Sequence, residues 1–86
     1  MEPILPFWFK QRQGKAEPAG ADTYRVTAPN LPETWLGVRQ NGDGRWGAFL
    51  RLAADGPELG STGAAYDSAG EAWDAAFELY REHVIV

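Results

Sequence analysis

The side chains of this chain whose types and spacing could support a function are arginines and aromatic residues. They are groups that bind, not groups that catalyse. His83 is the only histidine and cysteine is absent, so no nucleophilic relay with histidine and no thiolate metal site can be assembled. Asn41-Gly42-Asp43-Gly44 has the residue types of a calcium loop but lacks a glutamate at the required spacing. Residues 60–63 lack the lysine of a phosphate loop. We therefore expect no enzyme, no metal site and no cofactor.

Residues 34–52 are typical of a β-hairpin around this Asn-Gly-Asp-Gly turn. Residues alternate sides along a strand, so the loop length decides which positions share a face. A two- or four-residue loop would mix apolar and charged residues on both faces, whereas an odd loop with a bulge at Gly44 separates them. One face then holds Leu36, Val38, Trp46, Ala48, Leu50 and Leu52. The other holds Trp35, Gly37, Arg39, Arg45, Gly47, Phe49 and Arg51.

The second face carries large side chains that a hydrophobic core does not require. Tryptophan and arginine are over-represented among binding hot spots, and glycines at 37 and 47 allow a partner to approach the backbone. We expect this face to bind protein or DNA. The candidate binding residues are Trp35, Arg39, Arg45, Phe49 and Arg51. Two alternatives stay open: the segment Phe7-Trp8-Phe9 covers the face within the same chain, or a second copy does so in a homo-oligomer.

The apolar face requires a partner layer, and the C-terminal segment 66–84 can supply one. Ser68 and Glu71 have the spacing of a capping box, which predicts a helix from about Ser68 to His83. Apolar residues follow at helical spacing: Ala69, Ala72, Trp73, Ala76, Phe77, Tyr80 and Val84. Packing this stripe on the hairpin places Trp46, Leu50, Trp73 and Phe77 at the centre of the core.

The rest of the chain completes a small domain. Pro3 and Pro6 predict an edge strand or extended arm over residues 1–9, and Lys10 to Ala21 is typical of a flexible loop. Strands are expected from Thr23 to Ala28 and from Glu58 to Thr62. The sequence thus predicts one α+β domain, residues 1–86, with an arm and loop over 1–22 and an antiparallel sheet of three to five strands over 23–62. One C-terminal helix crosses one sheet face.

Charge and composition reduce the range of possible functions further. The net charge is −4, whereas nucleic-acid binders are usually basic. Residues 1–52 contain seven of the eight lysines and arginines, and residues 53–86 contain seven of the twelve acids. The N-terminus does not have the order of a signal peptide, and no apolar run reaches the length of a membrane span. We expect a cytoplasmic protein without membrane contact.

From residue 35 onward the chain resembles the AP2-type DNA-binding domain. The resemblance covers residues 35–80. It rests on Gly37-Val38-Arg39-Gln40, on Arg45-Trp46 with Ala48, Leu50 and Arg51, on Leu59-Gly60, on Tyr66-Asp67-Ser68-Ala69, and on Glu71-Ala72 with Ala75-Ala76. It implies a three-stranded sheet with a helix across it, and a sheet face that lies in the DNA major groove. By position, Arg39, Arg45 and Arg51 are then the DNA contacts.

Two functions compete at this point. The acidic total charge favours a non-catalytic module that binds a protein partner through the sheet face. The alternative is an AP2-like domain that reads duplex DNA with the same face.

Overall fold

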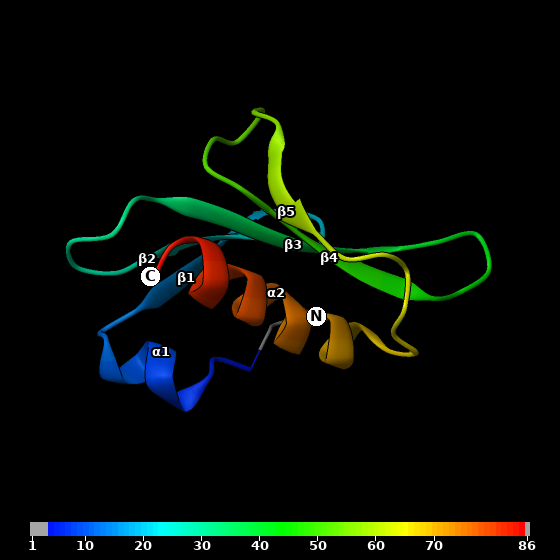
Figure 1. Cartoon of the computed structure of the whole chain (residues 1–86), viewed down its shortest axis with the longest axis horizontal. Coiled ribbons are helices and arrows are strands. Elements are labelled where there is room, and N and C mark those ends of the chain that lie inside the picture. Colours follow the sequence, from blue (N-terminus) through cyan, green and yellow to red (C-terminus); the bar gives the residue numbers. More distant parts are fainter. Residues whose placement is uncertain (1–3, 86) are drawn as a thin grey trace.

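The computed structural model describes residues 4–85 and contains one antiparallel sheet with both helices on the same side (Figure 1). The sheet follows chain order, β1-β2-β3-β4-β5. The elements are α1 (Phe7–Gln11), β1 (Lys15–Gly20), β2 (Thr23–Thr27), β3 (Thr34–Gln40), β4 (Trp46–Arg51), β5 (Glu58–Ser61) and α2 (Ala69–His83). The predicted α+β class, with a C-terminal helix packed across one sheet face, is confirmed.

The register of the β3–β4 hairpin separates apolar from charged residues as predicted. Leu36 pairs with Leu50 and Val38 with Ala48, while Gly37 pairs with Phe49. The loop between the two strands has an odd number of residues. The Asn41 N–H donates to the Arg45 carbonyl at 2.7 Å, and the residues between them close the loop. Gly44 lies there in the left-handed region with φ +88°, which suits a residue without Cβ.

The face towards α2 forms the core. Leu36, Val38, Ala48 and Leu50 are buried there. The prediction for Leu52 is wrong, because β4 ends at Arg51 and the Leu52 side chain lies in the following turn, 47% exposed.

Helix α2 begins where the capping box places it. Ser68 is the N-cap, and its hydroxyl oxygen accepts a hydrogen bond from the Glu71 N–H at 3.2 Å. The Glu71 carboxylate accepts from the same hydroxyl at 3.3 Å. Trp73 and Phe77 are buried at the centre of the core with Leu50, as predicted. The prediction for Trp46 is wrong: it is only half-buried, because it lies at the start of β4, where it pairs with Tyr66.

The N-terminal segment differs from the prediction of a strand or extended arm. Pro6 occupies the N-cap of α1, a helix start that tolerates proline because the first N–H groups need no intrahelical partner. Phe9 is fully buried, and its ring centroid lies 5.2 Å from that of Phe77 and 5.6 Å from that of Tyr80. Trp8 stacks on Tyr80 with centroids 6.4 Å apart. This segment therefore packs on α2, on the helix side of the sheet (Figure 1).

Strand β1 lies where a flexible loop was expected. It pairs with β2 along its length, for example Ala16 with Val26 and Glu17 with Arg25. Almost all of its residues are exposed, so the strand shows no alternation of apolar and polar residues that would distinguish it from a loop. Pro18 is tolerated because an edge strand has one side free of ladder hydrogen bonds.

Leucines at 50 and 52 test the assignment of the hairpin faces. Leu50 is fully buried and Leu52 is 47% exposed. Leu50→Ala should lower the free energy of unfolding by about 2–5 kcal/mol, whereas Leu52→Ala should change it by less than about 0.5 kcal/mol. Urea denaturation of both variants measures this. Equal losses would contradict the register.

Tyr80 provides a second test, in alkaline solution. Its ring is fully buried, and its hydroxyl has no hydrogen-bond partner within residues 4–85. Burial raises the pKa of Tyr80 above its ordinary value of 10.0, and the positive charge of Arg12 opposes that rise. A raised pKa favours the neutral phenol in the folded state, so stability should be complete below about pH 10 and should fall as the pH rises further.

Tyr80→Phe should remove this alkaline loss, and at pH 7 it should leave stability unchanged or raise it by up to about 1 kcal/mol, because an unpaired buried hydroxyl is lost. Urea denaturation at pH 7 and above pH 10 measures both effects. A large loss at pH 7 would show that the hydroxyl has a partner.

Candidate functional site

The sheet face opposite α2, hereafter the open face, carries a row of side chains that crosses all five strands. Glu17 pairs with Arg25, Arg25 with Trp35, Trp35 with Arg51, and Arg51 with Glu58. One residue comes from each strand. The row therefore has a half-buried tryptophan at its centre, an arginine on each side of it, and an acid at each end.

Phe49 lies on the same face but is not exposed, contrary to the expectation that its ring is free to bind. It is only 6% exposed. Its ring lies over Gly37, where an added Cβ would overlap the ring atoms. The guanidinium carbons of Arg39 and Arg51 lie over the ring at 4.7 and 4.8 Å from its centroid. The missing side chain at Gly37 and two cation–π contacts thus bury an aromatic residue on the uncovered side of the sheet.

Glu58 joins the two arginines above Phe49. Both of its carboxylate oxygens lie 2.7 Å from Nη2 of Arg39, and one lies 3.6 Å from Nη2 of Arg51. The hairpin that leads into β5 rises from the sheet on the side away from the helices (Figure 1), and this brings β5 towards the open face. We call Arg39, Glu58 and Arg51 the Phe49 cover.

The second arginine of the row is held in the same way. Arg25 lies 3.0 Å from Glu17 and 3.5 Å from Glu33. Trp35 therefore lies between two guanidinium groups, those of Arg25 and Arg51, that are each oriented by carboxylates. Exposed ion pairs contribute only about 0–1 kcal/mol to stability, so their main effect here is to fix the position of the guanidinium groups.

The remaining predicted site residues do not join this cluster. Nη2 of Arg45 donates to the Ala65 carbonyl at 3.0 Å and lies 3.7 Å from Asp67, so it ties the β3–β4 hairpin to the segment before α2. Trp8 and Phe9 belong to the helix side, and Phe7 is 75% exposed beside them. The Phe7-Trp8-Phe9 segment does not cover the open face.

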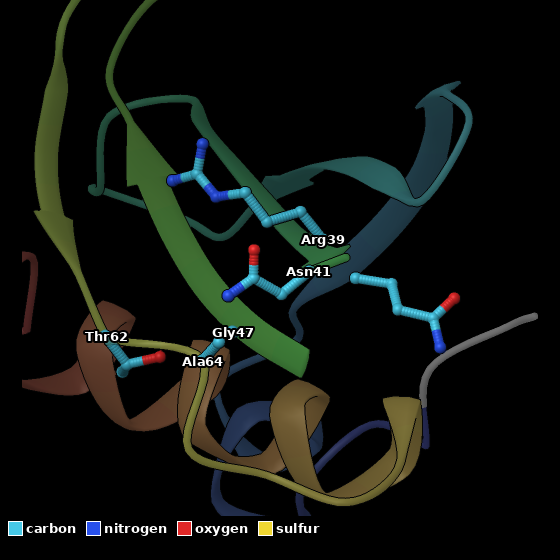
Figure 2. Close-up of a pocket in the computed structure, with 6 residues that line it drawn as sticks. Arg39, Asn41, Gly47, Thr62 and Ala64 are labelled. Carbon is cyan, nitrogen blue, oxygen red and sulfur yellow. The ribbon is translucent and has the colours of Figure 1, made fainter. Parts of the chain in front are cut away.

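A small hollow adjoins Arg39 at the hairpin end of the open face. Figure 2 shows Arg39, Asn41, Gly47, Thr62 and Ala64 around it. Its volume is about 190 Å³, below the roughly 300–1,000 Å³ of sites that enclose a small molecule. Gly47 is needed there because a Cβ would lie 3.0 Å from the Gly63 carbonyl oxygen. The hollow can accept one side chain of a partner but is too small to enclose a cofactor.

The edges of the sheet are poor sites for adding a partner strand. The register shifts in β1 between Pro18 and Gly20, and in the β4–β5 pair between Leu50 and Arg51. Ala19 and Leu59 are the additional residues of these irregularities. Bulges and edge prolines interrupt the row of backbone groups that another strand would need. The open face is therefore the better candidate for recognition.

The acids of the open face were not identified from the sequence. Glu17, Glu33 and Glu58 lie on β1, on the loop before β3 and on β5, and only the register aligns them with arginines. Glu17 and Arg25 did carry a signal, since they lie on opposite sides of a turn at Ala21-Asp22, and the additional residue Ala19 in β1 brings them into register. That signal required β1 to be recognised as a strand.

Within residues 4–85, no group of three or more histidine, cysteine, aspartate or glutamate side chains could hold a metal ion. In the same part of the chain no helix is long and apolar enough to cross a membrane. No protein-family model matches the sequence, and neither the curated proteins nor the solved structures compared with it include a match.

Gly37→Ala tests the burial of Phe49. The added methyl group must displace the ring and with it the Phe49 cover, so the free energy of unfolding should fall by about 1–3 kcal/mol. Gly42→Ala is the matched control, because no atom lies within 4 Å of its added Cβ, and it should stay within about 1 kcal/mol of the wild type. Urea denaturation compares the two. A Gly37→Ala protein as stable as Gly42→Ala would contradict the packing described here.

Proposed function

We propose that this chain is a non-catalytic protein-binding module that recognises its partner with the open face. The observation that carries the proposal is the five-strand row with Trp35 at its centre. A central aromatic residue inside a polar rim is the usual anatomy of a protein–protein interface. Tryptophan and arginine are also the residue types most enriched in its hot spots.

The ion pairs of the row support the same proposal through preorganisation. Arg25 and Arg51 are held by acids before any partner arrives. Ordering a free, rotamer-rich side chain on binding costs about 0.5–1.5 kcal/mol. Side chains that are already ordered avoid part of that cost, so binding energy from Trp35 is retained in the affinity.

Duplex DNA is the second candidate, because the AP2 resemblance assigns DNA contacts to Arg39, Arg45 and Arg51. The side chains of Arg39 and Arg45 are 52% and 50% exposed, so both are accessible to phosphate. Each of these three arginines, however, lies within 4 Å of a carboxylate of the same chain. The acids at both ends of the row would also repel a polyanion. We therefore favour a protein partner.

A second copy of the chain is a less favourable occupant of the open face. The row is symmetric about Trp35, with an arginine on each side. Two copies that stack tryptophan on tryptophan with their rows aligned would place arginines against arginines and acids against acids. Like charges in such positions oppose association. A different protein fits the charge pattern better than a homo-oligomer does.

A peptide-display selection on the immobilised protein tests the proposal. Peptides that bind the wild type should bind Trp35→Ala at least ten-fold more weakly, since a central hot spot is worth about 2 kcal/mol or more. Phe7→Ala is the matched control, because it removes an exposed aromatic side chain from the helix side. Urea denaturation verifies that both variants fold. Peptides that bind Trp35→Ala as well as they bind Phe7→Ala would contradict the proposal.

A salt titration separates the two candidate partners. Binding to a pool of duplex DNA should be weak, and Arg39→Ala with Arg51→Ala should not change its salt dependence. If the face reads DNA, affinity falls steeply with salt, and each lost phosphate contact lowers the slope by about one. Tight, sequence-selective binding with that salt dependence would show that the partner is DNA and not a protein.

A further inference from the structure

We propose that the open face binds an acidic peptide segment, and that Glu58 occupies the place of that segment's carboxylate in the free protein. This inference rests on the proposed function and names the chemistry of the partner. Arg39 and Arg51 then form the receptor for the carboxylate. Glu58 is an internal competitor that a partner displaces.

The geometry of the Phe49 cover supports this assignment. Both oxygens of Glu58 contact a single nitrogen of Arg39, Nη2, at 2.7 Å. Arg51 contributes only a 3.6 Å contact through its Nη2, and its buried Nε has no hydrogen-bond partner in the described part of the chain. An arginine offers five N–H donors and binds a carboxylate best through two parallel hydrogen bonds. The two guanidinium groups therefore have more donors than Glu58 uses.

Glu58 is also easily displaced. It begins β5, a four-residue edge strand, and it directly precedes the additional residue of the irregular pairing with β4. The Arg39 side chain of its ion pair is 52% exposed and the Glu58 side chain is 27% exposed, so water reaches the pair, and pairs in contact with water contribute little to stability. The arginines themselves stay in place without it, because both pack on the Phe49 ring.

The surroundings of the cover indicate which residues flank the partner's acid. Trp35 lies next to Arg51 on one side. On the other side, Glu58 lines a hollow of about 240 Å³ together with Leu52, Ala53, Gly56, Pro57 and Leu59. Leu52 and Leu59 are each 47% exposed. A segment with an acid between two apolar residues matches this order of tryptophan, arginines and apolar hollow.

A short acidic segment fits better than an extended polyanion. One carboxylate can replace Glu58 and leave the other acids of the face undisturbed. A duplex that spans the whole row would also meet Glu17 and Glu33, which already hold Arg25. The charge pattern thus matches a single acid at the Phe49 cover.

Glu58→Gln tests the proposal directly. The probes are two fluorescein-labelled pools of nine-residue peptides with random apolar residues around a fixed centre, which is glutamate in one pool and glutamine in the other. Fluorescence anisotropy should show that Glu58→Gln binds the glutamate pool about two- to five-fold more tightly than the wild type, the range expected from releasing a partly exposed ion pair. The glutamine pool should bind the variant and the wild type equally.

Glu78→Gln is the matched control. It removes the same charge from an exposed glutamate that pairs with an arginine, Arg81, on α2, so it reports any general effect of net charge. It should bind both pools as the wild type does.

Arg39→Ala combined with Arg51→Ala should lose the preference for glutamate. In NMR spectra of the wild type, the glutamate pool should shift the Nε–H signal of Arg51.

The outcomes separate this inference from the proposed function. If peptide binding depends on Trp35 but Glu58→Gln and Glu78→Gln bind the two pools alike, the proposal that the open face binds a partner stands. The proposal that this partner is an acidic segment is then wrong. If no peptide depends on Trp35, both proposals fail. If Glu58→Gln instead gains tight binding to duplex DNA, the anion is a phosphate and the peptide is excluded as the occupant.

Discussion

The register of the β3–β4 hairpin is the constraint on which the other features of this protein depend. Pairing Leu36 with Leu50 places the apolar residues under α2, and the same register places Phe49 opposite Gly37. A shift of this register by one residue would turn the side chains of one strand to the opposite face of the sheet. The buried core and the arginine-rich open face are thus two consequences of one odd-numbered loop.

The two faces achieve burial by different means. On the helix side, Leu50 belongs to a buried cluster that also contains Trp73, Phe77 and Tyr80 of α2 and Phe9 of α1. On the open face no helix covers Phe49 within the described residues; its ring lies on the backbone of Gly37 and under Arg39 and Arg51. Glu58 then closes this arrangement. The result is an aromatic ring shielded by charged side chains, which reduces the apolar area that the open face exposes.

The elements that follow from local periodicity and helix capping were predicted correctly from the sequence. The predictions were wrong where contacts with distant parts of the chain determine the structure. The hairpin faces, the cap at Ser68 and the stripe of α2 follow from local patterns. Strand β1 has a single neighbour and exposed residues, so it carries no alternation. Pro6 looked like a helix breaker, but it occupies the N-cap of α1. Phe49 looked exposed because the sequence does not reveal that the glycine opposite leaves room for its ring.

The direct measurement of the central claim is the chemical shift of the Gly37 Hα protons, with their nuclear Overhauser contacts to the Phe49 ring. A ring lying over Gly37 shifts at least one Hα strongly upfield, and Phe49→Leu should return it to the ordinary glycine range. Contacts between these protons and the ring would confirm the register and the burial of Phe49. An unshifted Gly37 without ring contacts would contradict both.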